Sequence, residues 1–307
     1  MPLHWTSLSR RSFLVSGSAL IGMTVFRPVF GADAEVDPDL FILMSDTHIP
    51  GSPDFNSKGV NMTANLKQVV AEIGRMPKRP GGVIINGDCA FVLGLPEDYA
   101  NLADCLEPIE EVGIPLHVTI GNHDDRGPLY EAFQAQKPAQ PVVDSKHISI
   151  IETERANWFL LDSMIQVRTK NGEFGEKQLE WLAQALDERR DKPAIILAHH
   201  YPMFEPGEEN GGFPDFRSGL LDTSKFLEIL TSRPQVKAYI FGHSHVWSVN
   251  RIKGLHLVNL PTTAYSRHGS PNGWVRARQT EEGLSLELRT MDPNHQLNGE
   301  RHLISWT

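Results

Sequence analysis

The sequence is poor in cysteine, and this scarcity excludes two kinds of protein. Only two cysteines, Cys89 and Cys105, occur among its 307 residues. A disulfide-rich scaffold and a cysteine-rich metal site both need more thiols than this. One bond between Cys89 and Cys105 stays open in an oxidising compartment, because spacing alone does not fix the geometry that a disulfide requires. We therefore assign no chemistry to either thiol.

Positive charge is also scarce. The chain carries 29 Lys and Arg residues against 38 Asp and Glu residues, for a formal net charge of -9. Nucleic-acid polymers and anionic membranes are bound by clustered Lys and Arg, so we expect neither as a partner. A bound metal cation would still draw a small anionic molecule into a cleft on such an acidic protein.

The N-terminal apolar stretch is too short for an ordinary membrane span. It runs from Val15 to Phe26, contains Gly17 and Gly22, and falls short of the ~20 apolar residues that a spanning helix needs. A retained anchor is the alternative to cleavage, but we expect no stable membrane anchor.

The residues around this stretch predict an export signal over residues 1–34. Arg10 and Arg11 precede it, and a small-residue cleavage site, Ala32-Asp33-Ala34, follows it. The two arginines followed by x-Phe-Leu resemble a twin-arginine signal. We therefore expect the twin-arginine export machinery as a partner and a periplasmic or secreted protein.

Beyond residue 40, short apolar runs alternate with amphipathic stretches. Five runs are typical of buried strands: Leu40–Met44, Val83–Ile85, Leu116–Ile120, Ala194–Ala198 and Ala238–Phe241. Four stretches have helical periodicity: Thr63–Arg75, Glu97–Val112, Glu176–Arg190 and Thr223–Ser232. This alternation predicts α/β layers.

The later part of the mature chain favours more strands. His147–Glu152 and Trp158–Asp162 predict a hairpin, and four further strands are indicated at Trp247–Ile252, Leu255–Leu260, Trp274–Thr280 and Leu284–Met291. We expect these late strands to form a second sheet packed on the first. Residues 35–307 would then make a single domain.

Five polar clusters stand at or just beyond the ends of the five buried strands. They are Asp46-Thr47-His48, Gly87-Asp88, Gly121-Asn122-His123-Asp124, His199-His200 and Gly242-His243-Ser244-His245. Taken singly, each has an ordinary explanation, because Asp-x-His is common by chance and a buried histidine is usually a core residue. As a set they predict one site, since ligands gather outside the carboxyl ends of the strands in an open α/β sheet. Mixed nitrogen and oxygen donors suit Mn, Fe, Co or Zn.

The ordered series D-x-H, G-D, G-N-H-D, H and G-H-x-H resembles the calcineurin-like metallophosphoesterase superfamily over about residues 40 to 290. The resemblance implies a four-layer α/β/β/α sandwich, with two packed mixed β-sheets flanked by helices and two metal ions at the sheet ends. It implies one metal held by Asp46, His48, Asp88 and His245. It implies the other held by Asp88, Asn122, His200 and His243, with Asp88 bridging both.

One ligand has two candidates. In similar family members the ligand histidine precedes a proline by two positions, and here Tyr201-Pro202 follows His200. This favours His200, and leaves His199 as a supporting or core residue.

The resemblance also implies a mechanism. Two metal ions would activate a shared hydroxide for in-line attack on phosphorus, while His123 would give a proton to the leaving group. Asp124 has two open roles: it accepts a hydrogen bond from His123, or it caps a helix predicted over residues 127–134. Asp125 is a second candidate for the cap.

Residues 121–126 read Gly-Asn-His-Asp-Asp-Arg, which resembles bacterial class III cyclic-nucleotide and glycerophosphodiester phosphodiesterases. Phe91 stands where purple acid phosphatases place a metal-binding tyrosine, so the chain departs from that branch. We therefore predict a phosphodiesterase acting on a small-molecule phosphoester. A phosphomonoesterase or pyrophosphohydrolase with the same site is the alternative, and a non-catalytic binding protein on the same fold is the third.

Several residues are candidates for substrate contact outside the metal set. Arginine or histidine side chains that could reach the phosphate or leaving group are Arg126, Arg217, Arg267 and His268. Aromatic side chains that could stack on a nucleobase are Phe213, Tyr265 and Trp274. For the arginines the alternative is a surface salt bridge, and for the aromatics a core position. The physiological substrate and the oligomeric state are not encoded in any of these patterns.

Overall fold

The computed structural model describes residues 34–205, 207–208, 210–212 and 217–307. The predicted export signal lies outside this part of the chain, except for Ala34, and so does Phe213. The predictions made for them stay predictions. Among the residues that are described, no helix is long and apolar enough to cross a membrane.

The described residues form strands and helices in alternation. The strands are β1 (Val36–Met44), β2 (Arg79–Asn86), β3 (Leu116–Thr119), β4 (Ser149–Glu152), β5 (Asn157–Leu160), β6 (Ala194–Leu197), β7 (Val236–Phe241), β8 (Ser248–Ile252), β9 (Leu255–Asn259), β10 (Gly273–Gln279), β11 (Gly283–Thr290) and β12 (Arg301–Ser305). The helices are α1 (Met62–Ile73), α2 (Pro96–Glu111), α3 (Arg126–Ala132), α4 (Glu176–Glu188) and α5 (Thr223–Thr231).

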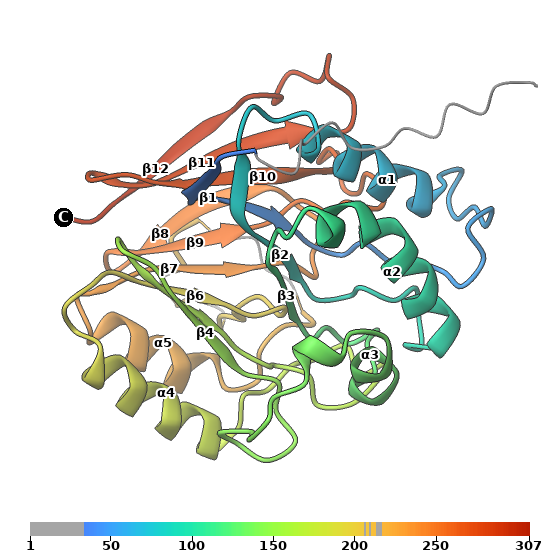
Figure 1. The fold of residues 1–307 in the computed structure, drawn as a ribbon. Coiled ribbons are helices and arrows are strands. Elements are labelled where there is room, and N and C mark those ends of the chain that lie inside the picture. The colour runs from blue at the N-terminus through green and yellow to red at the C-terminus, as the bar shows by residue number, and fades with distance from the viewer. Residues whose placement is uncertain (1–33, 206, 209, 213–216) are drawn as a thin grey trace, which may run out of the picture.

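Two mixed six-stranded sheets lie at the centre of the molecule. The first has the order β12-β11-β10-β1-β2-β3, and the second has the order β4-β5-β6-β7-β9-β8. Helices α1 and α2 lie on the side of the first sheet, while α4 and α5 lie on the side of the second (Figure 1). The four-layer α/β/β/α sandwich expected from the family resemblance is confirmed.

Side-chain alternation in the central strands explains the layers. In β1, Leu40, Ile42 and Met44 pack with the core that includes α1 and α2. Phe41 and Leu43 point the other way, into the core between the two sheets. Because both faces of such a strand are buried, its sequence is apolar at consecutive positions. Consecutive apolar residues therefore marked the five buried strands, and helical periodicity marked the four helices. Both were predicted to within a few residues of their observed bounds.

The expectation that the late strands form a sheet of their own is wrong. Strands β8 and β9 extend the second sheet beside β7, whereas β10, β11 and β12 extend the first sheet beside β1. Strand β10 runs antiparallel to β1, with Leu40 opposite Arg278. An alternating pattern shows that one face of a strand is buried, but it does not show against which sheet.

The two cysteines are both free thiols. Cys89 and Cys105 are buried, so the disulfide left open by the sequence is not formed. Burial, the largest influence on Cys105, raises the pKa of its thiol to about 11. A thiol with so high a pKa is a poor nucleophile at neutral pH.

Candidate metal centre

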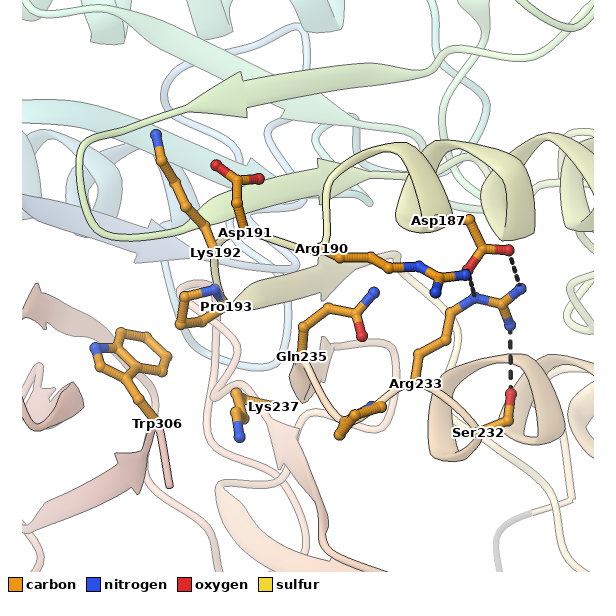
Figure 2. Close-up of a pocket in the computed structure, with 11 residues that line it drawn as sticks. Asp187, Arg190, Asp191, Lys192, Pro193, Ser232, Arg233, Gln235, Lys237 and Trp306 are labelled. Atoms are coloured by element: carbon orange, nitrogen blue, oxygen red, sulfur yellow. Dashed lines mark hydrogen bonds and ion pairs between the residues drawn. The ribbon is translucent and has the colours of Figure 1, made fainter.

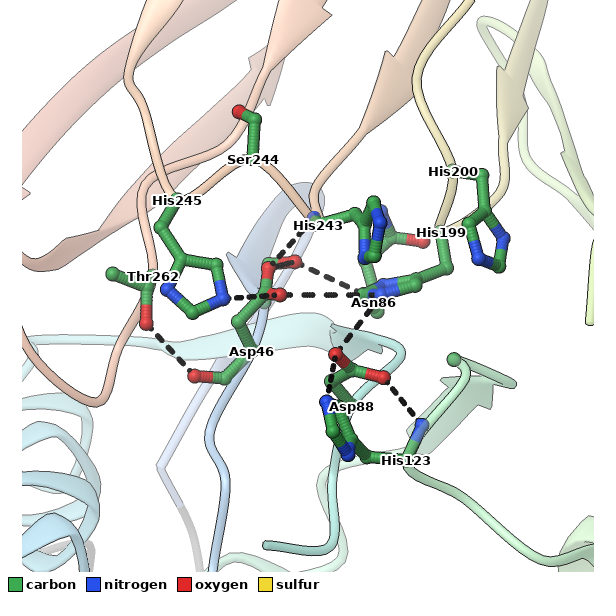
Figure 3. A network of polar contacts seen from close by, with 12 residues as sticks. Asp46, Asn86, Asp88, His123, His199, His200, His243, Ser244, His245 and Thr262 are labelled. Carbon is green, nitrogen blue, oxygen red and sulfur yellow. Dashed lines mark hydrogen bonds and ion pairs between the residues drawn. The ribbon is translucent and has the colours of Figure 1, made fainter. Parts of the chain in front are cut away.

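The five polar clusters come together at one place. Three of them follow β1, β2 and β3 of the first sheet, and two follow β6 and β7 of the second. Figure 3 shows side chains from both sheets facing one another across this point. The site therefore lies where the carboxyl ends of strands from two packed sheets meet, not along the edge of a single open sheet.

Left-handed backbone places the paired ligands at this point. Asp46 and His48 have φ values of 52° and 46°, and His243 and His245 have φ values of 65° and 63°. A positive φ in a residue with a side chain costs about 1–2 kcal/mol. Contacts between the loops stabilise this left-handed conformation. One of them is the hydrogen bond from His48 N–H to the Asp88 carbonyl oxygen, at 2.9 Å. Each sharp turn aims residues two apart at the same volume.

One group of potential ligands contains Asp46, His48 and His245, whose donor atoms lie within 4.8 Å of one another. His245 Nε2 is 3.1 Å from Asp46 Oδ1 and 3.2 Å from His48 Nε2. Asp88 Oδ2 lies 3.9 Å from His48 Nε2. These four residues are those assigned to the first metal by the family resemblance, and the structure brings them together.

A second group of donor atoms belongs to Asp88, His199 and His243, again within 4.8 Å of one another. The Asn122 Oδ1 atom is buried and has no hydrogen-bond partner among the described residues. The rings of His200 and His243 are 4.8 Å apart at their centroids. Asp88 also belongs to a third group, with His48 and His123, so its carboxylate lies between the two sets of histidines, as a bridging ligand must.

The choice between His199 and His200 is not decided by position alone. His199 Nε2 lies 3.2 Å from Asp88 Oδ2, and its Nδ1 lies 3.0 Å from the Asn86 carbonyl oxygen. His200 Nδ1 lies 2.8 Å from the Ser163 hydroxyl, while its Nε2 is buried with no partner among the described residues. Each ring has one nitrogen anchored by the protein. The preference for His200 stays a prediction.

The residues fit a metal centre on two grounds. Buried acceptors are left without hydrogen bonds, including Asp46 Oδ1, Asn122 Oδ1 and His200 Nε2. Such atoms are costly unless a ligand satisfies them. Burial also lowers the pKa of His48 to about 4 and that of His243 to about 3. Both rings are therefore neutral near pH 7, which is the form that binds metal.

His199 has the opposite electrostatics in the metal-free protein. Burial lowers its pKa, but the carboxylates of Asp88 and Asp46 outweigh burial and raise the pKa to about 10. The two carboxylates thus favour the protonated form of His199. A metal ion at that position would compete with this proton.

His123 lies at the open side of the site. Its Nδ1 is 2.9 Å from the Val92 carbonyl oxygen, an arrangement that assigns the Nδ1 proton and leaves Nε2 free. Its backbone N–H donates to Asp88 Oδ1 at 2.9 Å. The side chain retains 28% exposure, as a group that exchanges protons with a substrate requires.

Both roles predicted for Asp124 are wrong. The His123 ring contacts Val92, not Asp124, and α3 is capped by Asp125, whose carboxylate accepts from Gly127 N–H at 2.9 Å. The buried Asp124 carboxylate instead accepts from four donors, at 2.9–3.1 Å: the N–H groups of Cys89, Ala90 and Gly121 and the Tyr99 hydroxyl. It ties together the two loops that carry Asp88 and Asn122.

Five of the substrate-contact candidates fall into three groups. Arg126 makes two hydrogen bonds to Asp162, at 2.8 and 2.7 Å, and so forms a salt bridge. Trp274 is buried in the core. Tyr265, Arg267 and His268 line a cavity of about 220 Å³ at the metal centre.

Lys170, Tyr201 and Ser218 also line this cavity, and sequence reasoning had assigned them no role. Lys170 lies in the connection between β5 and α4, and Tyr201 and Ser218 lie between β6 and α5. No periodic pattern or ligand spacing marks such loop positions. The only sequence signal available was proximity to a strand end, which Tyr201 shares with many core residues.

Comparison with known proteins gives concordant results. A family model described as calcineurin-like phosphoesterase matches residues 40–247. A cAMP/cGMP dual specificity phosphodiesterase of Mycobacterium tuberculosis is 25% identical over 260 residues, which cover 81% of this chain and 76% of that protein. A glycerophosphodiester phosphodiesterase of Enterobacter lignolyticus is 23% identical, with coverages of 72% and 76%. In fold, a dimetal phosphatase from Danio rerio aligns with a TM-score of 0.65 and 16% identity, covering 88% of this chain and 100% of that one.

Proposed function

This chain belongs to the calcineurin-like phosphoesterase family, and we propose that it acts as a metal-dependent phosphodiesterase on a small-molecule substrate. Family membership makes it a metal-dependent phosphoester hydrolase. The preference for diesters is supported by relatives named as phosphodiesterases of cyclic nucleotides and of glycerophosphodiesters.

One observation carries the proposal: Asp88 belongs to two groups of carboxylate and imidazole donors, one with His48 and His123 and the other with His199 and His243. A residue common to both groups supports a binuclear centre rather than two unrelated sites. We assign Asp46, His48, Asp88 and His245 to one metal ion, and Asp88, Asn122, His200 and His243 to the other. The donor set suits Mn, Fe, Co or Zn.

When bound, two such ions supply Lewis-acid stabilisation of the phosphoryl oxygens and a nucleophile of lowered pKa. The protein's part is to hold the donors rigidly and to manage the leaving group. His123 Nε2 is free to carry a proton, because Nδ1 is held by the Val92 carbonyl oxygen. His123 therefore acts as the general acid toward the departing oxygen.

The test combines metal content with a pair of chromogenic substrates. We expect close to two transition-metal ions per chain by elemental analysis, and faster hydrolysis of bis-(p-nitrophenyl) phosphate than of p-nitrophenyl phosphate. Two ions with preference for the monoester would keep the site and make the chain a phosphomonoesterase. Absence of metal after supplementation with Mn, Fe, Co and Zn would refute the proposal.

We also propose that the chain is exported and that residues 35–307 form one domain. The Arg10-Arg11 pair and the Ala32-Asp33-Ala34 site support export by the twin-arginine route. The single domain is supported by the core between the sheets, which contains both Phe41 and Ile304. N-terminal sequencing of the mature protein would find residue 35 first, and an intact Met1 would contradict export by cleavage.

A further inference from the structure

The cavity at the metal centre has an outer wall made of donors and cations. Beyond the five polar clusters, it is lined by Lys170, Tyr201, Ser218, Tyr265, Arg267 and His268. No carboxylate occurs among these six residues. On a chain with a net charge of -9, a wall of this composition points to a ligand rich in negative charge.

The cations come from separate connections of the fold. Lys170 comes from the connection between β5 and α4, whereas Arg267 comes from the connection between β9 and β10. Both nevertheless line the same cavity at the metal centre.

A third cation stands close to Arg267. Lys58 Nζ lies 3.7 Å from the centroid of the Tyr265 ring, and Tyr265 in turn stacks on His48 with centroids 5.8 Å apart. Burial lowers the pKa of Lys58, and the Arg267 charge lowers it further. Two like charges thus stand near one another beside the metal centre.

These cations lack acidic partners within the described part of the chain. No carboxylate oxygen there lies within 4.0 Å of the side-chain nitrogens of Lys58, Lys170 or Arg267, and the Arg267 Nε–H group donates to His268 Nε2. Some other cations of the described residues do have an acidic partner, as Arg126 has in Asp162. An uncompensated cluster of cations raises the energy of the free protein and is relieved by an anion.

A second cavity, away from the metal centre, shows the contrasting arrangement. It measures about 620 Å³ and includes Arg190, Arg233 and Lys237 in its lining (Figure 2). There Asp187 pairs with both Arg190 and Arg233, at 2.6 and 2.8 Å. Its arginines are compensated by the protein itself, so it gives no comparable reason to expect an anionic ligand.

We propose that the substrate is a phosphodiester that carries a second anionic group, such as a further phosphate, bound by Lys170, Arg267 and Lys58. This inference rests on the proposed function. A simple phosphodiester has one negative charge, which two bound metal ions would neutralise. It would leave Lys170 and Arg267 at the opening, and Lys58 beside Tyr265, without an anionic partner, whereas a second phosphate of the same molecule would supply one.

The test uses two chromogenic diesters with the same leaving group. One is the p-nitrophenyl ester of thymidine 5′-monophosphate, and the other is the same molecule with a phosphate on its 3′ hydroxyl. We expect the wild-type protein to prefer the second by roughly tenfold or more in kcat/KM, mainly through KM. The preference should shrink as ionic strength rises, because salt screens these exposed charges.

Substitutions test whether Lys170 and Arg267 cause the preference for the diester with a second phosphate. In the double variant Lys170→Met and Arg267→Gln, the ratio of the two kcat/KM values should fall to near one. The ratio does not depend on how much of a variant folds, since both substrates report on the same active molecules. Lys237→Met is the matched control, because it removes one charge at the other end of β7, which is six residues long and spans ~20 Å. Its ratio should equal that of the wild type.

The outcomes separate this inference from the function on which it rests. A wild-type ratio near one, or a preference that survives in the double variant, overturns the role of the cations while the phosphodiesterase stands. Failure to hydrolyse either diester with metal supplied contradicts the proposed function itself.

Discussion

Replacing Asp124 by alanine gives the sharpest test of how the loops of the metal centre are held. The side chain is fully buried and accepts from four donors, three of them backbone N–H groups. Alanine offers none of them an acceptor. The change should therefore act on the stability of the fold, although Asp124 directly follows His123 in the sequence.

The size of the effect follows from the hydrogen bonds. A buried donor left without a partner costs about 2 kcal/mol, so four cost about 8 kcal/mol. Removing the carboxylate offsets part of this free-energy cost, because the carboxylate is itself unfavourable in its site. Burial and the Asp88 charge raise the pKa of Asp124 to about 6. The net loss should therefore be smaller than this sum, at about 5 kcal/mol, which is a large part of the stability of an ordinary domain.

The assay is unfolding by urea, with a chelator present so that metal binding does not add to stability. Asp125→Ala is the matched control, because it removes only the exposed cap of α3 and should cost about 1 kcal/mol. If Asp124→Ala unfolded at the wild-type midpoint and lost activity only toward poor leaving groups, Asp124 would be serving His123 and the reasoning here would be wrong.

Three other predictions concern single histidines or their partners. If His200 is the ligand, Ser163→Ala should weaken metal binding by about 10–100-fold, because the Ser163 hydroxyl, 2.8 Å from His200 Nδ1, orients the ring. Unchanged affinity in metal titrations would favour His199 as the ligand. His123→Ala should keep both metal ions by elemental analysis and lose about 10²–10⁴ in rate, most for poor leaving groups; loss of metal would show that His123 is a ligand. Burial lowers the pKa of His147 despite Asp162 nearby, whereas the unfolded chain binds this proton below about pH 6.5. Stability should therefore fall as pH falls from about 6.5 toward the lower folded pKa, and His147→Gln should flatten this slope in urea titrations at several pH values.

The sequence was most informative where one physical cause dominates. Strand β6 is apolar at consecutive positions because Ile196 faces the helices and Ile195 faces the other sheet. The ligand clusters were visible because they directly follow such strands. Neither observation required knowledge of distant pairing.

What escaped prediction depends on contacts between distant segments. Strand β12 was missed because, within Arg301–Ser305, only Ile304 is buried. Asp124 was misread because its donors, such as the Tyr99 hydroxyl, come from other elements of the chain. A role for Lys170 could not be predicted, because only the fold places it in the same cavity as Arg267.

The pairing of β1 with β10 has a consequence for the synthesis of the protein. Leu40 reaches its partner Arg278 only when the chain through residue 278 has left the ribosome. Until then β1 has an open edge, and such edges recruit other strands into aggregates. A chain stopped at residue 247, where the family match ends, would contain every proposed ligand but lack the strands that cover β1. We expect the complete metal centre to form only after β10 has left the ribosome and paired with β1.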